Sequence, residues 1–535
     1  MPGRCGIGRD IGKHQLGVEP SVMYASLHRS SQLGLLARDF ASIRVRKAGS
    51  RRDKTVRRIV SRLGLMHGLP QKIGQLLAFS EIDASDQSFT RLTESPSEQA
   101  TRAELLNVEA ALGGTISDLF SHFEPEGISA SIGKVYRGVL KDGRCVAVKI
   151  QHPGVADAVN YDLRALGWLT VPLGGLRKNF DLASYRREIG ESLSSELDYR
   201  LEAANIRAFS RLARGLSGKV QVPEVIEEFS SEEALTMSWL SGDHLSQAAT
   251  WSQSDRLLLS KTLVELFLSS CLDWGIIHAD PHPGNYRFSR IEGKPTIGLL
   301  DFGCVKRLPA RLQSGLRGLI EMGMNGEIDS DSVFVQFENM GFNTAVLEPM
   351  KTKLASIASV LLEPFAKSGP YNVDSWELSA RLKEILASDR MNFRAAGPSE
   401  LIFFLRSFQG MIQYLKILDT PVDWRMFAER VLQKQPLEDA SRVVPPEDRT
   451  TVKHMNSETL HIQVMENGER KVALAFGASA TDNLSDLVPH ELHQRLADRS
   501  INLKEISRKA KASNYQPGEL FSLKEESKSV SVWLQ

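Results

Sequence analysis

Three polar residues near the middle of the chain have types and spacing suited to phosphate chemistry. Residues 278–285 read HADPHPGN, which separates Asp280 from Asn285 by five positions, and residues 299–303 read LLDFG, which places Asp301 after an apolar run. Mg²⁺ prefers hard oxygen ligands and usually takes one or two from the protein beside phosphate oxygens and water. We therefore expect Asn285 and Asp301 to hold Mg²⁺ and Asp280 to orient an attacking hydroxyl or water.

The order of these residues is that of the catalytic loop and the Asp-Phe-Gly motif of protein kinases. The loop departs from an ordinary kinase, because two prolines and a glycine stand where such a loop carries Leu-Lys-Pro-Glu or similar. We interpret His278 as a structural residue that supports the loop, since the histidine of a kinase loop is not a base. His282 has no third soft ligand nearby, which argues against a metal-binding histidine pair.

A lysine further upstream is a candidate for phosphate contacts. Lys149 ends the apolar run VAVK, from which its ammonium could reach phosphate groups, although strands often end in a surface lysine. A carboxylate must fix this lysine, and the helical stretch 191–208 offers Glu196 and Glu202. These two glutamates are six residues apart and do not share one helix face, so they must serve different partners. For Glu196 and Asp198, solvent-facing charges are the alternative interpretation.

The expected phosphate loop is poor in glycine. Its candidate nucleotide-binding residues are Ala130, Ser131, Ile132 and Gly133. A kinase loop is rich in glycine because a residue without a side chain lets the backbone approach the phosphates. With one glycine left, we expect an altered phosphate geometry or an altered nucleotide preference.

The surrounding pattern changes from helix to strand and back to helix. Helix-spaced apolar residues occupy 24–80, and strands are expected within 120–140, at 146–150 after an Asp-Gly turn, and at 222–229 and 234–239. A long amphipathic helix at 252–274 is expected to bury Leu263, Leu266, Phe267 and Cys271, and residues 314–432 read as mostly helical. A strand-rich part followed by a helix-rich part predicts an α+β fold with the two lobes of a kinase.

The last part of the chain reads as a separate small α+β unit. A hairpin with an Asn-Gly turn is expected over 461–476, followed by a helix near 488–512 and a terminal strand at 530–534. A linker rich in proline and charge precedes it. The predicted division is a disordered terminus at 1–20, a helical extension at 21–115, two lobes at 116–245 and 246–432, a linker at 433–450 and the small unit at 451–535.

Composition excludes several classes of protein. With 42% hydrophobic and 24% charged residues the chain is globular, and a net charge of +1 argues against a nucleic-acid binder. The four cysteines show no metal-ligand spacing, which favours reduced thiols in the cytoplasm. The first residues lack an apolar core, so we expect no secretory signal, and the longest apolar runs contain charges such as Arg406, so we expect no transmembrane segment. A basic cluster between residues 38 and 62 is either a solvated helix face or a contact for an anionic membrane surface or acidic partner.

Six motifs taken together resemble the UbiB/AarF-type atypical kinase-like family. They are KIGQ at 72–75, SASIGKV at 129–135, VAVKIQHPG at 146–154, ELDYRLEAAN at 196–205, HADPHPGN at 278–285 and LLDFG at 299–303. The resemblance covers about residues 60–425. HADPHPGN combined with ELDYRLEAAN and KIGQ is highly specific, whereas VAVK or DFG alone is not.

This resemblance implies a protein-kinase-like fold whose N-terminal helical extension covers the surface where a kinase docks a peptide. It implies that Lys149 pairs with Glu202 and acts with Asp280 in catalysis, with ATP and Mg²⁺ as cofactors. It also implies a regulatory gate over the site in which Lys72 pairs with Glu196; the other gate residues are Gln75 and Asp198.

Family members look like ATPases or small-molecule and lipid kinases, and many support synthesis of ubiquinone or other isoprenoid quinones at a membrane surface. The resemblance therefore implies an enzyme whose partners are a nucleotide and either an anionic membrane surface or a lipid or quinone precursor, in the cytoplasm and peripheral to the inner membrane. The alternative is a nucleotide-sensing pseudokinase scaffold without turnover, and an ordinary protein kinase ranks last. The phosphoryl acceptor and the oligomeric state stay open.

Three departures from the family pattern bear on the site. Ser129 replaces an alanine and Lys134 replaces a glutamine, and we expect Lys134 to touch a phosphate or point to solvent. Ser238 stands where relatives often carry glutamate, which is compatible with adenine recognition through backbone groups. The chain ends in an α+β unit where some bacterial members carry transmembrane helices, which questions stable membrane residence.

Overall fold

The computed structural model describes residues 97–130, 132–153, 155, 190–191, 195–434 and 436, and then shorter stretches between 457 and 535. The predictions for residues 1–96, which include Lys72 and Gln75, lie outside the described residues. So do Ser131 and nearly all of the predicted linker.

An antiparallel sheet forms the first lobe, with strand order β1-β3-β4-β5-β7 and β2 paired to β4. Its strands are β1 (Ser97–Gln99), β2 (Phe120–Phe123), β3 (Glu126–Ser129), β4 (Gly133–Leu140), β5 (Cys145–Gln151) and β7 (Ala234–Ser238). The predicted Asp-Gly turn between β4 and β5 is confirmed, and its Gly143 has a φ of +91°, which a glycine adopts without strain.

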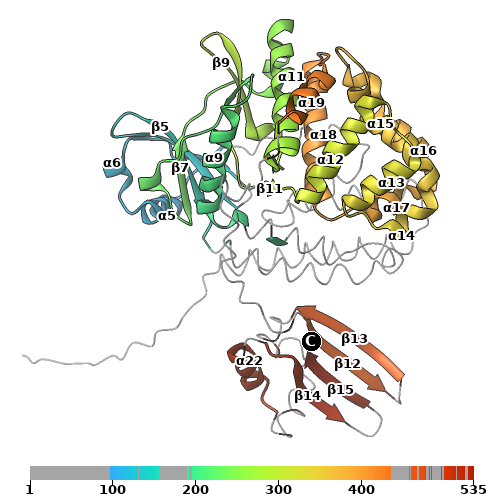
Figure 1. The fold of residues 1–535 in the computed structure, drawn as a ribbon. Helices are drawn as coiled ribbons and strands as arrows, with labels where there is room; N and C mark the ends of the chain where they lie inside the picture. Colours follow the sequence, from blue (N-terminus) through green and yellow to red (C-terminus); the bar gives the residue numbers. More distant parts are fainter. Residues whose placement is uncertain are drawn as a thin grey trace, which may run out of the picture.

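Helices lie on both faces of this sheet (Figure 1). They are α5 (Arg102–Leu112), α6 (Ile116–Leu119) and α9 (Tyr199–Ala213). Successive side chains of a strand point to opposite faces. Along β5, Val146 and Val148 pack with α5, whereas Ala147 belongs to the core that includes α9. Lys149, two residues after Ala147, therefore lies on the α9 face.

The second lobe is mostly helical, as predicted for residues 314–432. Its helices are α10 (Leu245–Ala248), α11 (Gln253–Leu268), α12 (Ala310–Asn325), α13 (Ser330–Asn339), α14 (Thr344–Leu347), α15 (Leu354–Ala366), α16 (Leu378–Leu386), α17 (Arg390–Ala396), α18 (Leu401–Leu418) and α19 (Trp424–Leu432). Figure 1 shows them gathered beside the first lobe, with α11, α18 and α19 nearest to it. The predicted α+β class with two lobes is confirmed.

Short strands carry the polar residues at the junction of the lobes. They are β8 (Ile276–His278), β9 (Tyr286–Ile291), β10 (Lys294–Leu299) and β11 (Val305–Arg307), and β6 (Lys219–Gln221) pairs in parallel with β10. A 3₁₀ turn, η3 (Pro283–Asn285), lies between β8 and β9. The loop 278–285 and the motif 301–303 are thus each held at the end of a strand.

Two expected elements differ in detail. The predicted helix over 252–274 is α-helical to Leu268 and continues as a π-helix over Ser269–Trp274. The strand predicted at 222–229 is wrong: Val225 makes one isolated bridge to Met237, and Glu227–Phe229 is a 3₁₀ turn. Pro223 explains the difference, because proline has no N–H to donate to a sheet.

The last part of the chain forms a four-stranded sheet of order β13-β12-β15-β14 with one helix. The elements are β12 (Thr459–Glu466), β13 (Glu469–Gly477), α22 (Leu503–Ala512), β14 (Gly518–Lys524) and β15 (Lys528–Leu534). The predicted hairpin and terminal strand are confirmed. Strand β14 was not predicted, because its segment GELFSLK has a glycine at one end and charged residues after it.

Candidate nucleotide site

Lys149 lies at the centre of a buried charge cluster. Its Nζ is 2.5 Å from Glu202 Oε1 and 2.8 Å from Asp301 Oδ2. The side chains of Lys149 and Glu202 are 7% and 4% exposed, whereas that of Asp301 is 31% exposed. Asp301 is therefore the carboxylate of this cluster that a ligand can reach.

Electrostatics keep the lysine charged. Burial acts to lower the pKa of Lys149, but the carboxylates of Asp301 and Glu202 outweigh it and hold this pKa above its usual value. Burial raises the pKa of Glu202, which Lys149 opposes by stabilising the carboxylate. The cluster thus presents a fixed cation at the boundary between the two lobes.

Helix α9 positions both Glu202 and the Asp-Phe-Gly motif. The backbone N–H of Phe302 donates to Glu202 Oε1 at 3.0 Å, and Asn205 Nδ2 donates to the Phe302 carbonyl at 3.0 Å. The Phe302 ring is fully buried, with its centroid 5.4 Å from that of Phe209. Three residues of α9 therefore contact one residue, which fixes the backbone next to Asp301.

The loop 278–285 is tied to the same motif. His278 Nε2 lies 2.5 Å from the Asp301 carbonyl oxygen, and burial lowers the pKa of His278. The backbone N–H of Leu300 donates to the Asn285 carbonyl at 2.9 Å, and Asn285 Nδ2 donates to the Asp280 carbonyl at 3.3 Å. The structure thus brings Asp280, Asn285 and Asp301 together, and the buried His278 with its contact to the Asp301 carbonyl matches its interpretation as a loop support.

Sequence reasoning missed the partner of Asp280. Arg406, on helix α18, places its guanidinium NH2 nitrogen 2.5 Å from Asp280 Oδ1, across 126 positions of sequence. The arginine side chain is 2% exposed and that of Asp280 is 11% exposed. The sequence contained one signal, because a buried arginine in an apolar helix needs a partner. The distance in sequence between Arg406 and Asp280 does not identify Asp280 as that partner.

The glycine of the expected phosphate loop has a structural task. A Cβ placed on Gly133 would lie 2.2 Å from the carbonyl oxygen of Ile150, so β4 and β5 could not pair as closely with any other residue. Ala130 N–H donates to the Gly133 carbonyl at 2.8 Å, which closes the turn around Ile132. Strand pairing alone therefore accounts for this glycine.

For Lys134 the solvent-facing expectation is wrong, whereas the phosphate contact stays a prediction. Its Nζ lies 2.8 Å from Glu104 Oε1, and the residue is 6% exposed. Glu104 belongs to the capping box of α5, in which its other oxygen accepts from Thr101. Because α5 packs over this face of the sheet, Lys134 is used to attach a helix and does not point to solvent.

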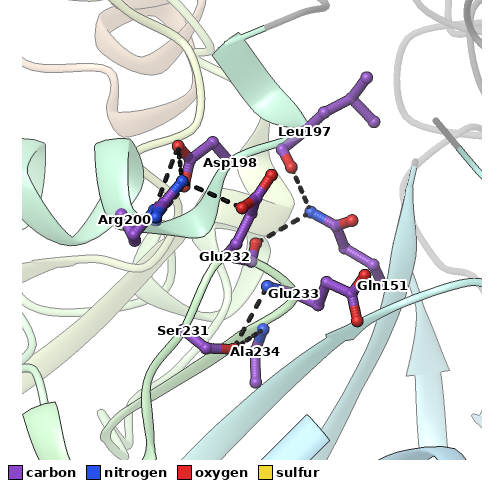
Figure 2. Close-up of polar contacts among 8 residues, drawn as sticks. All are labelled: Gln151, Leu197, Asp198, Arg200, Ser231, Glu232, Glu233 and Ala234. Atoms are coloured by element: carbon purple, nitrogen blue, oxygen red, sulfur yellow. Dashed lines mark hydrogen bonds and ion pairs between the residues drawn. The ribbon is translucent and has the colours of Figure 1, made fainter. Parts of the chain in front are cut away.

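The segment before α9 is anchored to the end of β5 (Figure 2). Asp198 accepts from the backbone N–H of Arg200 at 2.9 Å and so caps the helix. Gln151 Nε2 donates to the Leu197 carbonyl at 2.7 Å. Glu196 is 7% exposed, so the solvent-facing alternative is wrong for this glutamate. Its pairing with Lys72 stays a prediction, because Lys72 lies outside the described residues.

In the part of the chain that the structure describes, no helix is both long and apolar enough to cross a membrane. The same part holds no group of three or more His, Cys, Asp and Glu residues arranged for a metal ion. Mg²⁺ often binds to only two protein oxygens, with phosphate oxygens and water completing its coordination. Such a site has fewer than three protein ligands.

Known proteins resemble both the sequence and the fold. Residues 91–331 match the model of the ABC1 atypical kinase-like domain. The chain is 28% identical over 357 residues to the mitochondrial atypical kinase coq-8 of Caenorhabditis elegans, covering 65% of this chain and 47% of that protein. It is 29% identical over 341 residues to the mitochondrial atypical kinase COQ8B of Rattus norvegicus, covering 62% and 63%. The chain thus spans less than two thirds of the length of either relative.

Among solved structures, the Rv3197–erythromycin complex from Mycobacterium tuberculosis aligns over 71% of this chain and 96% of that one, with 25% identity and a TM-score of 0.48. The match of residues 91–331 to the ABC1 atypical kinase-like domain and the similarity to these atypical kinases confirm the predicted resemblance to the UbiB/AarF-type family.

Proposed function

We propose that this chain binds ATP with Mg²⁺ and transfers or hydrolyses the terminal phosphate, in support of isoprenoid-quinone or other lipid metabolism. The observation that carries the proposal is the contact of Lys149 with both Glu202 and Asp301, beside Asn285 and Asp280. Phosphoryl transfer needs positioned charge more than covalent chemistry, and this arrangement supplies it.

The residues fit a magnesium ion by their donor chemistry. Asp301 offers a carboxylate that is 31% exposed, and Asn285 offers an amide oxygen from the adjoining loop. Bound Mg²⁺ would neutralise charge on the phosphate oxygens. Lys149 would contact phosphates near the Ala130–Gly133 turn, and Asp280 would orient the hydroxyl or water that attacks.

A gate over this site is part of the proposal. A Cβ placed on Gly303 would lie 3.6 Å from Glu196 Cγ and 3.9 Å from Glu202 Oε2, so the buried Glu196 is next to the Asp-Phe-Gly motif. A cation brought to Glu196 by the KIGQ segment would therefore stand beside the metal ligands. Lys72 would supply that cation, with Gln75 and the cap Asp198 supporting the closed arrangement.

The link to lipid chemistry rests on the family. The two relatives reported above are named as mitochondrial atypical kinases of the coq-8 and COQ8B type. We propose a peripheral contact with an anionic membrane surface, where a lipid or quinone precursor would be the acceptor or the activator. A deletion strain analysed for isoprenoid quinones should show their loss, and unchanged quinones would remove this part of the proposal.

Turnover is tested with γ-labelled ATP, with and without anionic vesicles or phenolic quinone precursors. We expect Mg²⁺-dependent hydrolysis or transfer that these additions stimulate. In Asp280→Asn we expect about a 100-fold or greater loss of turnover with nucleotide binding retained, because a positioned general base contributes at least that factor. Binding without any turnover in the unmodified protein would favour the pseudokinase scaffold, and transfer to a generic peptide would favour an ordinary kinase.

A further inference from the structure

One face of helix α18 contacts the loop 278–285 at three points. Arg406 pairs with Asp280, and the hydroxyl of Ser407 donates to the carbonyl of His278. Gly410 lies one turn after Arg406, on the same side of the helix. A Cβ placed on Gly410 would lie 2.2 Å from both Cβ and Cγ of Pro281.

These contacts leave little freedom for the loop. Atoms 2.2 Å apart overlap severely, so a side chain at position 410 would push α18 and the loop apart. Ser407 and Arg406 attach to His278 and Asp280, which both precede Pro281, one through a carbonyl and one through a carboxylate. Helix α18 therefore fixes both the backbone of the loop and the side chain of Asp280.

Charge shows why an arginine is needed at this position. Residues 278–285 contain no lysine or arginine, and Lys149 is already engaged by Glu202 and Asp301. Burying a carboxylate is costly unless a cation or several hydrogen bonds pair with it. Arg406 supplies that cation to Asp280 from outside the loop, and a bond to one carboxylate oxygen also limits rotation of the group.

We propose that Arg406 is a positioning residue for the reaction, which holds the Asp280 carboxylate in the correct orientation. Helix α18 is then part of the active centre, although it lies beyond the residues 91–331 that match the family domain. The inference deepens the proposed function and rests on it for its kinetic consequences, but the ion pair itself can be tested without turnover.

The kinetic test compares Arg406→Ala and Arg406→Lys with the unmodified protein. We expect Arg406→Ala to lower kcat at least 100-fold with little change in KM for Mg·ATP, because α18 contacts the loop and not Lys149. Arg406→Lys keeps the charge but loses the planar fork, so it should recover only part of the rate. Added guanidinium ion should raise the rate of Arg406→Ala at least tenfold by replacing the lost cation.

Arg256→Ala is the matched control. Arg256 also binds α18, through the Leu418 carbonyl at its C-terminal end, but it does not contact the loop. Its removal should leave kcat close to that of the unmodified protein, and guanidinium should not stimulate it. An equal loss of kcat in Arg256→Ala and Arg406→Ala, or no guanidinium effect on Arg406→Ala, would overturn the positioning role.

A double-mutant cycle of Arg406→Ala and Asp280→Ala tests the pair by thermal unfolding. We expect each single variant to lower Tm and the double variant to lower it by clearly less than the sum, because each single change removes the opposite charge from a buried ionic group. Additive shifts would refute the pairing even if the protein hydrolyses ATP. Coupled shifts in a protein without turnover would retain the pairing while the proposed catalytic function fails.

Discussion

Two charge clusters of the site are built in different ways. The Lys149 cluster joins β5, α9 and the Asp-Phe-Gly motif, all within residues 91–331. The Asp280–Arg406 pair joins the loop to α18, outside that range. The family motifs thus make up only part of the proposed site, since a helix outside the matched range contacts Asp280.

The two clusters also differ in their access to ligand. Asp301 keeps 31% of its side chain exposed, whereas Asp280 keeps 11% and Arg406 only 2%. A ligand can therefore replace Asp301 as a partner of Lys149 without local unfolding. The Asp280–Arg406 pair, in contrast, is buried by the packing around it. We expect nucleotide to rearrange the first cluster and to leave the second unchanged.

The largest effect on stability is expected from Lys149→Ala. Removing the lysine leaves Glu202 buried without its cation, and breaking a buried pair in this way costs about 3–5 kcal/mol. Urea unfolding gives the free energy of unfolding directly. Arg137→Ala is the control, because its pair with Glu124 is exposed on both sides and should cost about 0–1 kcal/mol. Equal losses in the two variants would contradict a buried charge centre.

A smaller effect on stability is expected from Gly410→Ala, which tests the second cluster without altering any charge. The added methyl group would overlap Pro281, and such overpacking costs about 1–3 kcal/mol. Turnover should fall together with stability, because the loop that carries Asp280 must shift. Gly215→Ala is the control, since a Cβ there meets its nearest atom at an ordinary 3.5 Å. Full turnover in Gly410→Ala would show that α18 does not set the loop position.

The smallest effect is expected from Lys134→Gln, which separates helix attachment from nucleotide contact. Loss of the bond to the partly exposed Glu104 should lower stability by about 1 kcal/mol, the net contribution of a typical hydrogen bond. The affinity for Mg·ATP, measured by calorimetry, should change little because Lys134 faces α5. A loss of affinity of tenfold or more would reassign Lys134 to the phosphates.

The sequence was informative where chemistry depends on local spacing. The Asp280-to-Asn285 interval, the apolar strand before Asp301 and the Asp-Gly turn after β4 all follow from neighbouring residues. The assignment of Glu202 rather than Glu196 to Lys149 required the family resemblance, because both glutamates fit one helical stretch. The structure gives this contact a geometric reason, since Glu202 lies in the first turn of α9 on the face toward β5.

Long-range packing could not be predicted from neighbouring residues in the sequence. Arg406 lies 126 positions from Asp280, and Gly410 is identified as a contact only once α18 is placed against Pro281. Lys134 was misjudged for a similar reason: the face of β4 that α5 covers is a tertiary feature, and the strand pattern alone left solvent as an option. In each case a helix distant in sequence determines the environment of the residue.

Binding of Mg·ATP at Asp301 is best tested by the thermal shift that Mg·ATP produces in the unmodified protein and in Asp301→Asn. We expect a rise in Tm with ATP that requires Mg²⁺, is removed by EDTA and is lost in Asp301→Asn, because a ligand that binds only the folded state stabilises it. Asp255→Asn, which removes an exposed pair with Arg290, should keep the full shift. An unchanged shift in Asp301→Asn, or a shift that does not depend on Mg²⁺, would contradict the central claim.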